Sequence, residues 1–123
     1  MVNQMMCTLL KAKLHHIRVT QADLNYEGSL TIDEDLMDAV GIVNYEKILV
    51  ADLENGNRLE TYAIRGPRGS GVCCLNGAAA HCGKVGDRLI VMCWCQKSES
   101  EMASHQPRVV RLDGHNRIVA AAL

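Results

Sequence analysis

The sequence is poor in aromatic side chains. It has no Phe, one Trp (Trp94) and three Tyr (Tyr26, Tyr45 and Tyr62) in 123 residues, yet 48% of its residues are hydrophobic. The core must therefore be built from aliphatic side chains, Met, Ala and Cys, and we expect Tyr45 and Trp94 to be packing residues. The scarcity leaves no platform on which single-stranded bases could stack. A chain of this length forms one domain, so residues 1–123 are assigned to a single unit.

An excess of one charge is also missing. The 13 basic residues nearly balance the 14 acidic ones, which gives a formal net charge of −1. That balance argues against a nucleic-acid partner, because such proteins normally carry a clear basic excess. No apolar run approaches the ~18 residues that cross a bilayer, and the N-terminus lacks the pattern of a signal peptide. We therefore expect a cytoplasmic protein with no membrane partner.

Cysteine spacings typical of metal or redox sites are absent. None of the six Cys forms a C-x-x-C pair, and cytosolic thiols stay reduced. Cys is therefore expected to serve as a small apolar residue, and no metal site is predicted. The cysteines are Cys7, Cys73, Cys74, Cys82, Cys93 and Cys95.

Alternating apolar and polar residues predict short strands. The first covers residues 10–20, with Lys13 and His15 on one face and a change of face after His16. The pattern as a whole is typical of an all-β barrel or sandwich with about six or seven strands. The other expected strands are residues 30–32, 47–53, 58–64, 72–75, 88–95 and a pair flanking 113–116, and residues 97–106 are interpreted as a loop.

Two local patterns are specific. Asp33 is a suitable N-cap for a short helix over residues 33–40, and Gly41 occupies the place of a left-handed C′ residue. Asn55-Gly56 predicts a tight turn between the strands at 47–53 and 58–64.

Gly28-Ser29 has two interpretations. As a bare dipeptide it is a turn, which is how we interpret Gly69-Ser70. It could also be a self-cleavage site, where the Ser hydroxyl attacks the preceding carbonyl and converts the amide into an ester. Gly would help, because it has no Cβ and tolerates unusual dihedrals. Elimination would then leave dehydroalanine, and hydrolysis would give a pyruvoyl group.

Two further features have both a structural and a functional interpretation. Lys13 and Arg58 are either solvated strand-face charges or carboxylate ligands, for which the planar fork of Arg is suited. The segment from Asn76 to Ala79 is either an ordinary helix cap or an anion-binding turn with small residues that permit close approach.

Four segments together resemble the bacterial L-aspartate α-decarboxylases, pyruvoyl enzymes of pantothenate and coenzyme A biosynthesis. Their order and approximate spacing also fit that family, across most of residues 5–95, whereas the tail after Gln96 resembles it little. The segments are Lys11-Ala12-Lys13-Leu14-His15, residues 19–29 (VTQADLNYEGS), residues 55–64 (NGNRLETYAI) and residues 75–81 (LNGAAAH).

The resemblance implies a double-psi β-barrel, assembled as a homotetramer with active sites between subunits. It further implies a zymogen that cleaves itself between Gly28 and Ser29 into residues 1–28 and 29–123. Ser29 would become the covalent pyruvoyl cofactor, which forms a Schiff base with L-aspartate, and no metal is implied. The product would be β-alanine.

The resemblance also implies roles for individual residues of this sequence. Tyr62 resembles the proton donor, and Thr61 and Asn76 resemble residues that assist cleavage at Gly28 and Ser29. Substrate binding is implied for Lys13, His15, Arg58, Gly77, Ala78 and Ala79.

Two interpretations stay open beside this one. The chain could be an unprocessed or inactive β-barrel homologue that acts as a binding module. It could also be a non-enzymatic barrel of another class, which the near-neutral charge disfavours. The sequence identifies no maturation partner.

Overall fold

The computed structural model describes residues 5–121, which form an all-β barrel fold with little helix. Nine strands lie within those residues: β1 (Met6–Arg18), β2 (Gln21–Asp23), β3 (Ser29–Asp33), β4 (Lys47–Asp52), β5 (Arg58–Gly66), β6 (Cys73–Asn76), β7 (Arg88–Ser98), β8 (Arg108–Leu112) and β9 (Ile118–Ala121). The helices are α1 (Glu34–Val40), the 3-10 helix η1 (Gly77–His81) and α2 (Glu99–Met102).

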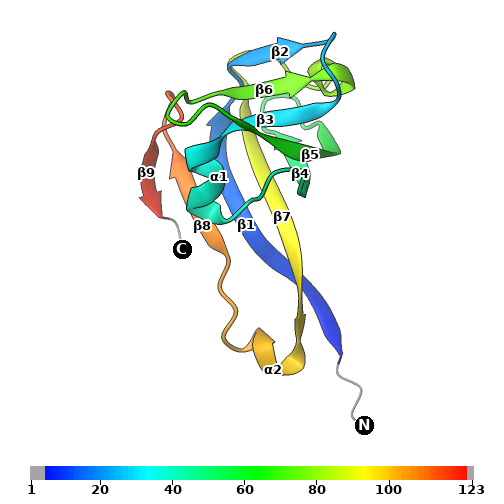
Figure 1. Ribbon diagram of the computed structural model, residues 1–123, viewed down its shortest axis with the longest axis vertical. Helices are drawn as coiled ribbons and strands as arrows, with labels where there is room; N and C mark the ends of the chain where they lie inside the picture. Colours follow the sequence, from blue (N-terminus) through cyan, green and yellow to red (C-terminus); the bar gives the residue numbers. More distant parts are fainter. Residues whose placement is uncertain (1–4, 122–123) are drawn as a thin grey trace.

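One sheet holds all nine strands in the order β2-β6-β3-β5-β4-β7-β1-β8-β9. The strands exceed the six or seven expected, and the three-residue strand β2 is too short to show an alternating pattern. The antiparallel β1–β7 pair forms a long twisted ribbon, and β2, β6 and β3 lie across its upper end (Figure 1). Parallel pairing of β3 with β5 brings the start of β3 to the middle of the β4–β5 hairpin.

The core is aliphatic, as the composition predicts. Its largest fully buried side chains are Leu14, Ile17, Leu30, Ile32, Met37, Ile48, Leu75, Leu89, Val19, Val40, Val50 and Val91. The expectation that Tyr45 and Trp94 pack inside is wrong for the single chain, because they are 71% and 46% exposed. With so few aromatics, the chain fills its interior without them.

Helix α1 begins and ends where the sequence predicts. The Asp33 carboxylate accepts a hydrogen bond from the Asp35 amide (2.9 Å), and Gly41 is left-handed with a φ of 79°. Asp33 also accepts bonds from the amides of Gly69 (3.1 Å) and Gly71 (2.9 Å). One buried carboxylate thus fixes the end of β3 against the loop that leads into β6.

The sequence predicts the irregularity in β1 correctly and the segment at residues 97–106 only in part. Strand β1 has the predicted change of face, because a bulge beside His15 places His16 in the left-handed region with a φ of 68°. The loop assigned to residues 97–106 is wrong in part, since β7 continues to Ser98 and α2 follows. Ser98 and Glu101 form the capping box that starts α2, a pattern visible in the sequence. In the described part of the chain, no helix is long and apolar enough to span a membrane.

Candidate functional site

A buried serine and a buried asparagine face each other where β3 begins and β6 ends. Ser29 is only 1% exposed and lies directly opposite Asn76 in the antiparallel ladder. The Asn76 amide nitrogen donates to Ser29 Oγ (2.8 Å) and to Thr31 Oγ1 (2.8 Å). Its side chain makes no capping bond to η1. Asn76 thus occupies the N-cap position of η1, but its side-chain amide is directed at the expected cleavage site and not at the helix.

Cys74 completes this group from the same strand. Its Sγ donates to the other end of the Asn76 amide, Oδ1, at 3.1 Å. Ser29 with Thr31, and Cys74 with Asn76, are each two residues apart, so strand alternation places all four side chains on one face. We call these four residues the cleavage cluster. Sequence reasoning missed Thr31 and Cys74, although the period of two could have found them.

Gly77 packs against the backbone that is expected to break. Its φ is 62°, and a Cβ there would lie 2.8 Å from Tyr26 O and 2.9 Å from Gly28 Cα and N. No larger residue fits without moving the segment. Gly28 itself is exposed and lies outside the left-handed region, and a Cβ added to it would meet nothing within 4 Å. Of these two glycines, Gly77 is the one that adopts a left-handed dihedral.

A small cavity opens beside the cleavage cluster. Its volume is about 280 Å³, enough for several waters or a small molecule. It is lined by Gln21, Asp23, Tyr26, Thr31, Pro67, Val72, Cys74 and Asn76. The cavity therefore gives access to the cluster from the side of β2.

Strand β5 brings one expected catalytic residue alongside Ser29. Leu30 lies opposite Ala63 in a parallel pair, so the preceding residues, Ser29 and Tyr62, fall at the same level. The β4–β5 ladder runs without a bulge, so Thr61 points to the opposite face from Tyr62, beside Ile48. The role of Thr61 stays a prediction.

Arg58 shares the face of Tyr62 but lies farther along the strand. The two positions are four residues apart, which is about 13 Å along the strand, and Arg58 is exposed opposite Ala51.

Of the small residues after Asn76, Gly77 and Ala79 are buried, whereas Ala78 is exposed. All three belong to η1, directly beyond the cleavage cluster.

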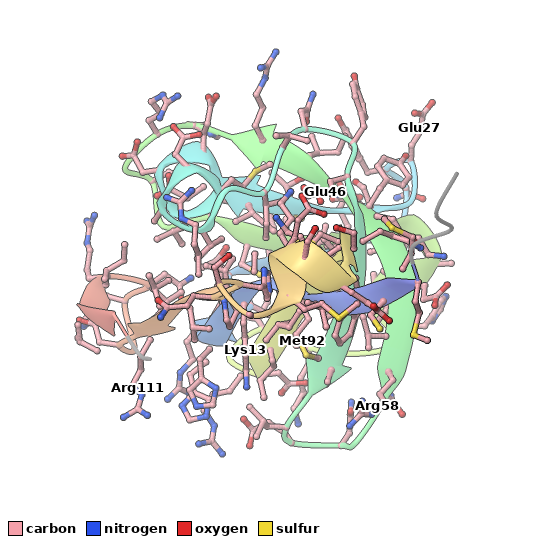
Figure 2. All side chains as sticks on the ribbon, turned by 90° about the horizontal axis from the view of Figure 1, so that it is seen from below. Lys13, Glu27, Glu46, Arg58, Met92 and Arg111 are labelled. Atoms are coloured by element: carbon pink, nitrogen blue, oxygen red, sulfur yellow. The ribbon has the colours of Figure 1, made fainter. Side chains whose placement is uncertain are left out.

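Lys13 and His15 lie on a strand that does not pair with the strand of Ser29. They belong to β1, which is four strand steps from β3, or about 19 Å along the sheet. Figure 2 shows Lys13 beside Met92, with Arg58 and Glu27 toward one side of the view and Arg111 toward the other. Within the described residues, no strand pairing joins Lys13 or His15 to the cleavage cluster.

The surroundings of Lys13 and His15 are cationic, and we call Lys13, His15 and Arg111 the cationic face. The His15 ring stacks on His16 with centroids 3.9 Å apart. Burial lowers the pKa of His15, and the charges of His16, Lys13 and Arg111 lower it further. His15 is therefore neutral at pH 7 and can accept a hydrogen bond.

An apolar strip separates the cationic face from β5. Lys13, Met92, Leu49 and Glu60 follow one another across β1, β7, β4 and β5. Met92 and Leu49 are only half-buried, and Trp94 on the same face is exposed. The sheet thus presents apolar surface between Lys13 and His15 on β1 and Arg58 on β5, which are all expected substrate ligands.

Comparison with known proteins identifies the chain. The family model described as aspartate decarboxylase matches residues 5–119. The chain belongs to the aspartate decarboxylase family. The match includes the tail after Gln96, although that segment by itself resembles the family little.

Curated relatives agree with the family assignment. The chain is 56% identical over 115 residues to the aspartate 1-decarboxylase of Syntrophobacter fumaroxidans, covering 94% of this chain and 93% of the relative. It is 55% identical over 114 residues to that of Exiguobacterium sibiricum, with coverages of 93% and 90%. The enzyme of Neisseria meningitidis is 54% identical over 111 residues, with coverages of 90% and 87%. An aspartate decarboxylase is thus matched along nearly its whole length.

Titratable groups outside the cleavage cluster include one unusual pair. Asp52 and Asp87 are each 3% exposed, and Asp52 Oδ2 has no hydrogen-bond partner. Burial and the neighbouring Asp87 raise the pKa of Asp52 to about 6.

Among residues 5–121, no group of three or more His, Cys, Asp or Glu is arranged to hold a metal.

Proposed function

We propose that this aspartate decarboxylase cleaves its own chain between Gly28 and Ser29 and then converts L-aspartate into β-alanine and CO2 for pantothenate synthesis. The observation that carries the proposal is the buried Ser29 hydroxyl, which receives a hydrogen bond from Asn76 in a chain of this family. The products of cleavage are residues 1–28 and residues 29–123.

The cleavage chemistry needs only this chain and water. Ser29 Oγ attacks the Gly28 carbonyl carbon, the C–N bond breaks, and the hydroxyl proton passes to the freed amine. A base then removes the α-proton of residue 29, and the Cβ–O bond breaks to give the Gly28 carboxylate and dehydroalanine. Tautomerisation to the imine and addition of water release ammonia and leave a pyruvoyl group. Asn76 favours the first step, because its N–H group donates to Ser29 Oγ and stabilises that oxygen as its proton leaves.

The residues around Ser29 fit a pyruvoyl group. The Ser29 side chain is enclosed and has a hydrogen-bond donor at Asn76, and Gly77 places no side chain against the adjoining backbone of Gly28. The ketone of that group, when present, supplies the electron sink for decarboxylation. Tyr62, at the level of Ser29 on the neighbouring strand, supplies the proton that replaces the lost carboxylate.

Arg58 binds the carboxylate that the substrate keeps. A strong ion pair to the departing carboxylate would stabilise the substrate more than the transition state, because that charge leaves as CO2. A guanidinium fork on the retained β-carboxylate anchors the substrate without that penalty. Lys13 and neutral His15 contribute to carboxylate binding from β1, and Ala78 and Ala79 form the pocket wall beside Gly77.

The distance between β1 and β3 favours a composite site. Lys13 and His15 of one subunit would join Ser29, Tyr62 and Arg58 of another, and the exposed apolar strip with Trp94 would be covered by the contact. A homotetramer with sites between subunits satisfies both requirements. The test is to co-express Lys13→Ala and Arg58→Gln chains and to assay them at an aspartate concentration at which each variant alone shows little activity. Random mixing restores about a quarter of the sites, whereas sites contained in single chains would give no recovery.

The six free thiols suit the reducing cytoplasm, which is the compartment we propose. Fractionation of cells that express the full chain tests this point.

Intact mass spectrometry tests the cleavage. The purified wild-type chain should resolve into residues 1–28 and 29–123 on incubation and should make β-alanine. Ser29→Ala should stay whole and inactive. Ser70→Ala is the matched control, because Ser70 also follows a Gly but lies in an exposed loop. A wild-type chain that stays intact and makes no β-alanine would support the unprocessed binding module instead.

A further inference from the structure

We propose that Cys74 is a positioning residue for self-cleavage, whose thiol holds the Asn76 amide with its nitrogen toward Ser29. The contact is Cys74 Sγ to Asn76 Oδ1 at 3.1 Å, on the side of the amide away from Ser29. This inference rests on the proposed cleavage at Gly28–Ser29. It gives one of the six cysteines a role that its apolar interpretation did not include.

The orientation of the amide matters for the nucleophile. With the nitrogen toward β3, Asn76 donates to both Ser29 Oγ and Thr31 Oγ1. The second lone pair of Ser29 Oγ stays free for attack, and the donor stabilises the oxygen as its proton leaves. A rotation of the amide by 180° would place Oδ1 against both hydroxyls. Ser29 would then donate its proton to Asn76, and the developing negative charge would face a carbonyl oxygen.

A thiol in this position selects the first orientation. An S–H group is a donor, although a weak one, and it needs an acceptor such as Oδ1. Cys74 is only 6% exposed, and its burial together with the charge of Asp23 raises its pKa, so it keeps its proton at neutral pH. The rotated amide would instead direct an N–H group at a protonated thiol.

The neighbouring cysteine provides a control within the same strand. Cys73 precedes Cys74, points into the hydrophobic core and is fully buried. It lies opposite Ile32, whereas Cys74 lies opposite Thr31. Substitutions at the two positions remove the same atoms from the same strand, and only one of them changes the contact with Asn76.

The experiment measures the rate of chain splitting in two matched pairs. Cys74→Ser and Cys74→Ala differ by a hydroxyl donor, as do Cys74→Thr and Cys74→Val, which have the same shape. We expect the variants without a donor to split roughly three- to tenfold more slowly than their partners, with Cys74→Ser within about twofold of wild type. Hydroxylamine, which cleaves the ester as it forms, should not remove the difference, because the affected step is formation of that ester. Cys73→Ala should split at the wild-type rate.

The splitting rates of these variants decide between the role of the Cys74 thiol and a merely structural effect. Equal rates within a pair overturn the inference, as does a Cys73→Ala variant that is slowed as much as Cys74→Ala. If the smaller pair fails to fold, the Thr and Val variants decide by the same criterion. A wild-type chain that never splits overturns the proposed function, whereas a wild-type chain that splits no faster than Cys74→Ala and Cys74→Val overturns this inference alone.

Discussion

The cleavage cluster and the cationic face differ in how completely one chain builds them. In the cleavage cluster, Ser29, Thr31 and Cys74 are each linked to Asn76 by a hydrogen bond, and Gly77 packs against the backbone of Tyr26 and Gly28. The cationic face has Lys13 and His15 half-buried at the surface, with other cations beside them and apolar surface next to them.

Under the proposed function, the cleavage cluster and the cationic face act at different stages. A cluster whose partners all belong to one chain can cut that chain before any assembly is complete. In the proposed composite site, the cationic face on β1 takes part in the reaction through Ser29 of a second subunit. Substitutions in the first region should therefore affect splitting, and those in the second should affect turnover of the split enzyme.

The largest expected effect is that of Gly77→Ala. Its Cβ would press on Tyr26 O and Gly28 Cα, and displacement of a reacting group by ~1 Å costs about a hundredfold in rate. We expect splitting, followed by intact mass, to slow about a hundredfold. Gly56→Ala is the control, because its φ of 76° is similar but a Cβ there meets nothing within 4 Å. It should lose about 1 kcal/mol of stability and split normally; slow splitting of both would attribute the effect to backbone strain.

Arg58→Gln tests substrate binding without changing cleavage. Loss of a charge-assisted fork should raise KM for aspartate roughly 10- to 100-fold, while chain splitting continues because Arg58 lies about 13 Å along β5 from the level of Ser29. Steady-state kinetics on the split enzyme measures this. Arg65→Gln, an exposed cation on the same strand, should leave KM unchanged. An unchanged KM in Arg58→Gln would show that Arg58 does not bind the β-carboxylate.

Asp52→Asn should change stability and leave both regions active. The folded state holds the Asp52 proton up to about pH 6, whereas an ordinary Asp releases it near 3.8. The free energy of unfolding therefore falls as pH rises from about 4 to about 6, by up to about 3 kcal/mol. Asn has no proton to lose, so the variant should be more stable than wild type at pH 8 and similar at pH 4. Urea unfolding at both pH values measures this, and a difference that does not vary with pH would show that Asp52 is not the cause.

Local patterns were sufficient for much of the fold. Asp33 and Gly41 delimit α1 because capping depends on neighbours within a few residues, and Asn55-Gly56 predicts its hairpin for the same reason. The capping box of Ser98 and Glu101 carried the same kind of information for α2, although we interpreted that segment as a loop. Strand β2 gave no pattern, because its three residues form a strand only by pairing with β6.

The sequence by itself determined an aliphatic all-β domain and, through the segments around Ser29 and Asn76, its family. Only the tertiary structure decided that Asn76 donates to Ser29 instead of capping η1, and that Cys74 and Thr31 share its amide. It also decided that Lys13 and His15 lie four strands from Ser29. The physical reason is that capping and turns depend on adjacent residues, whereas a cross-strand contact depends on a register that joins residues nearly fifty positions apart.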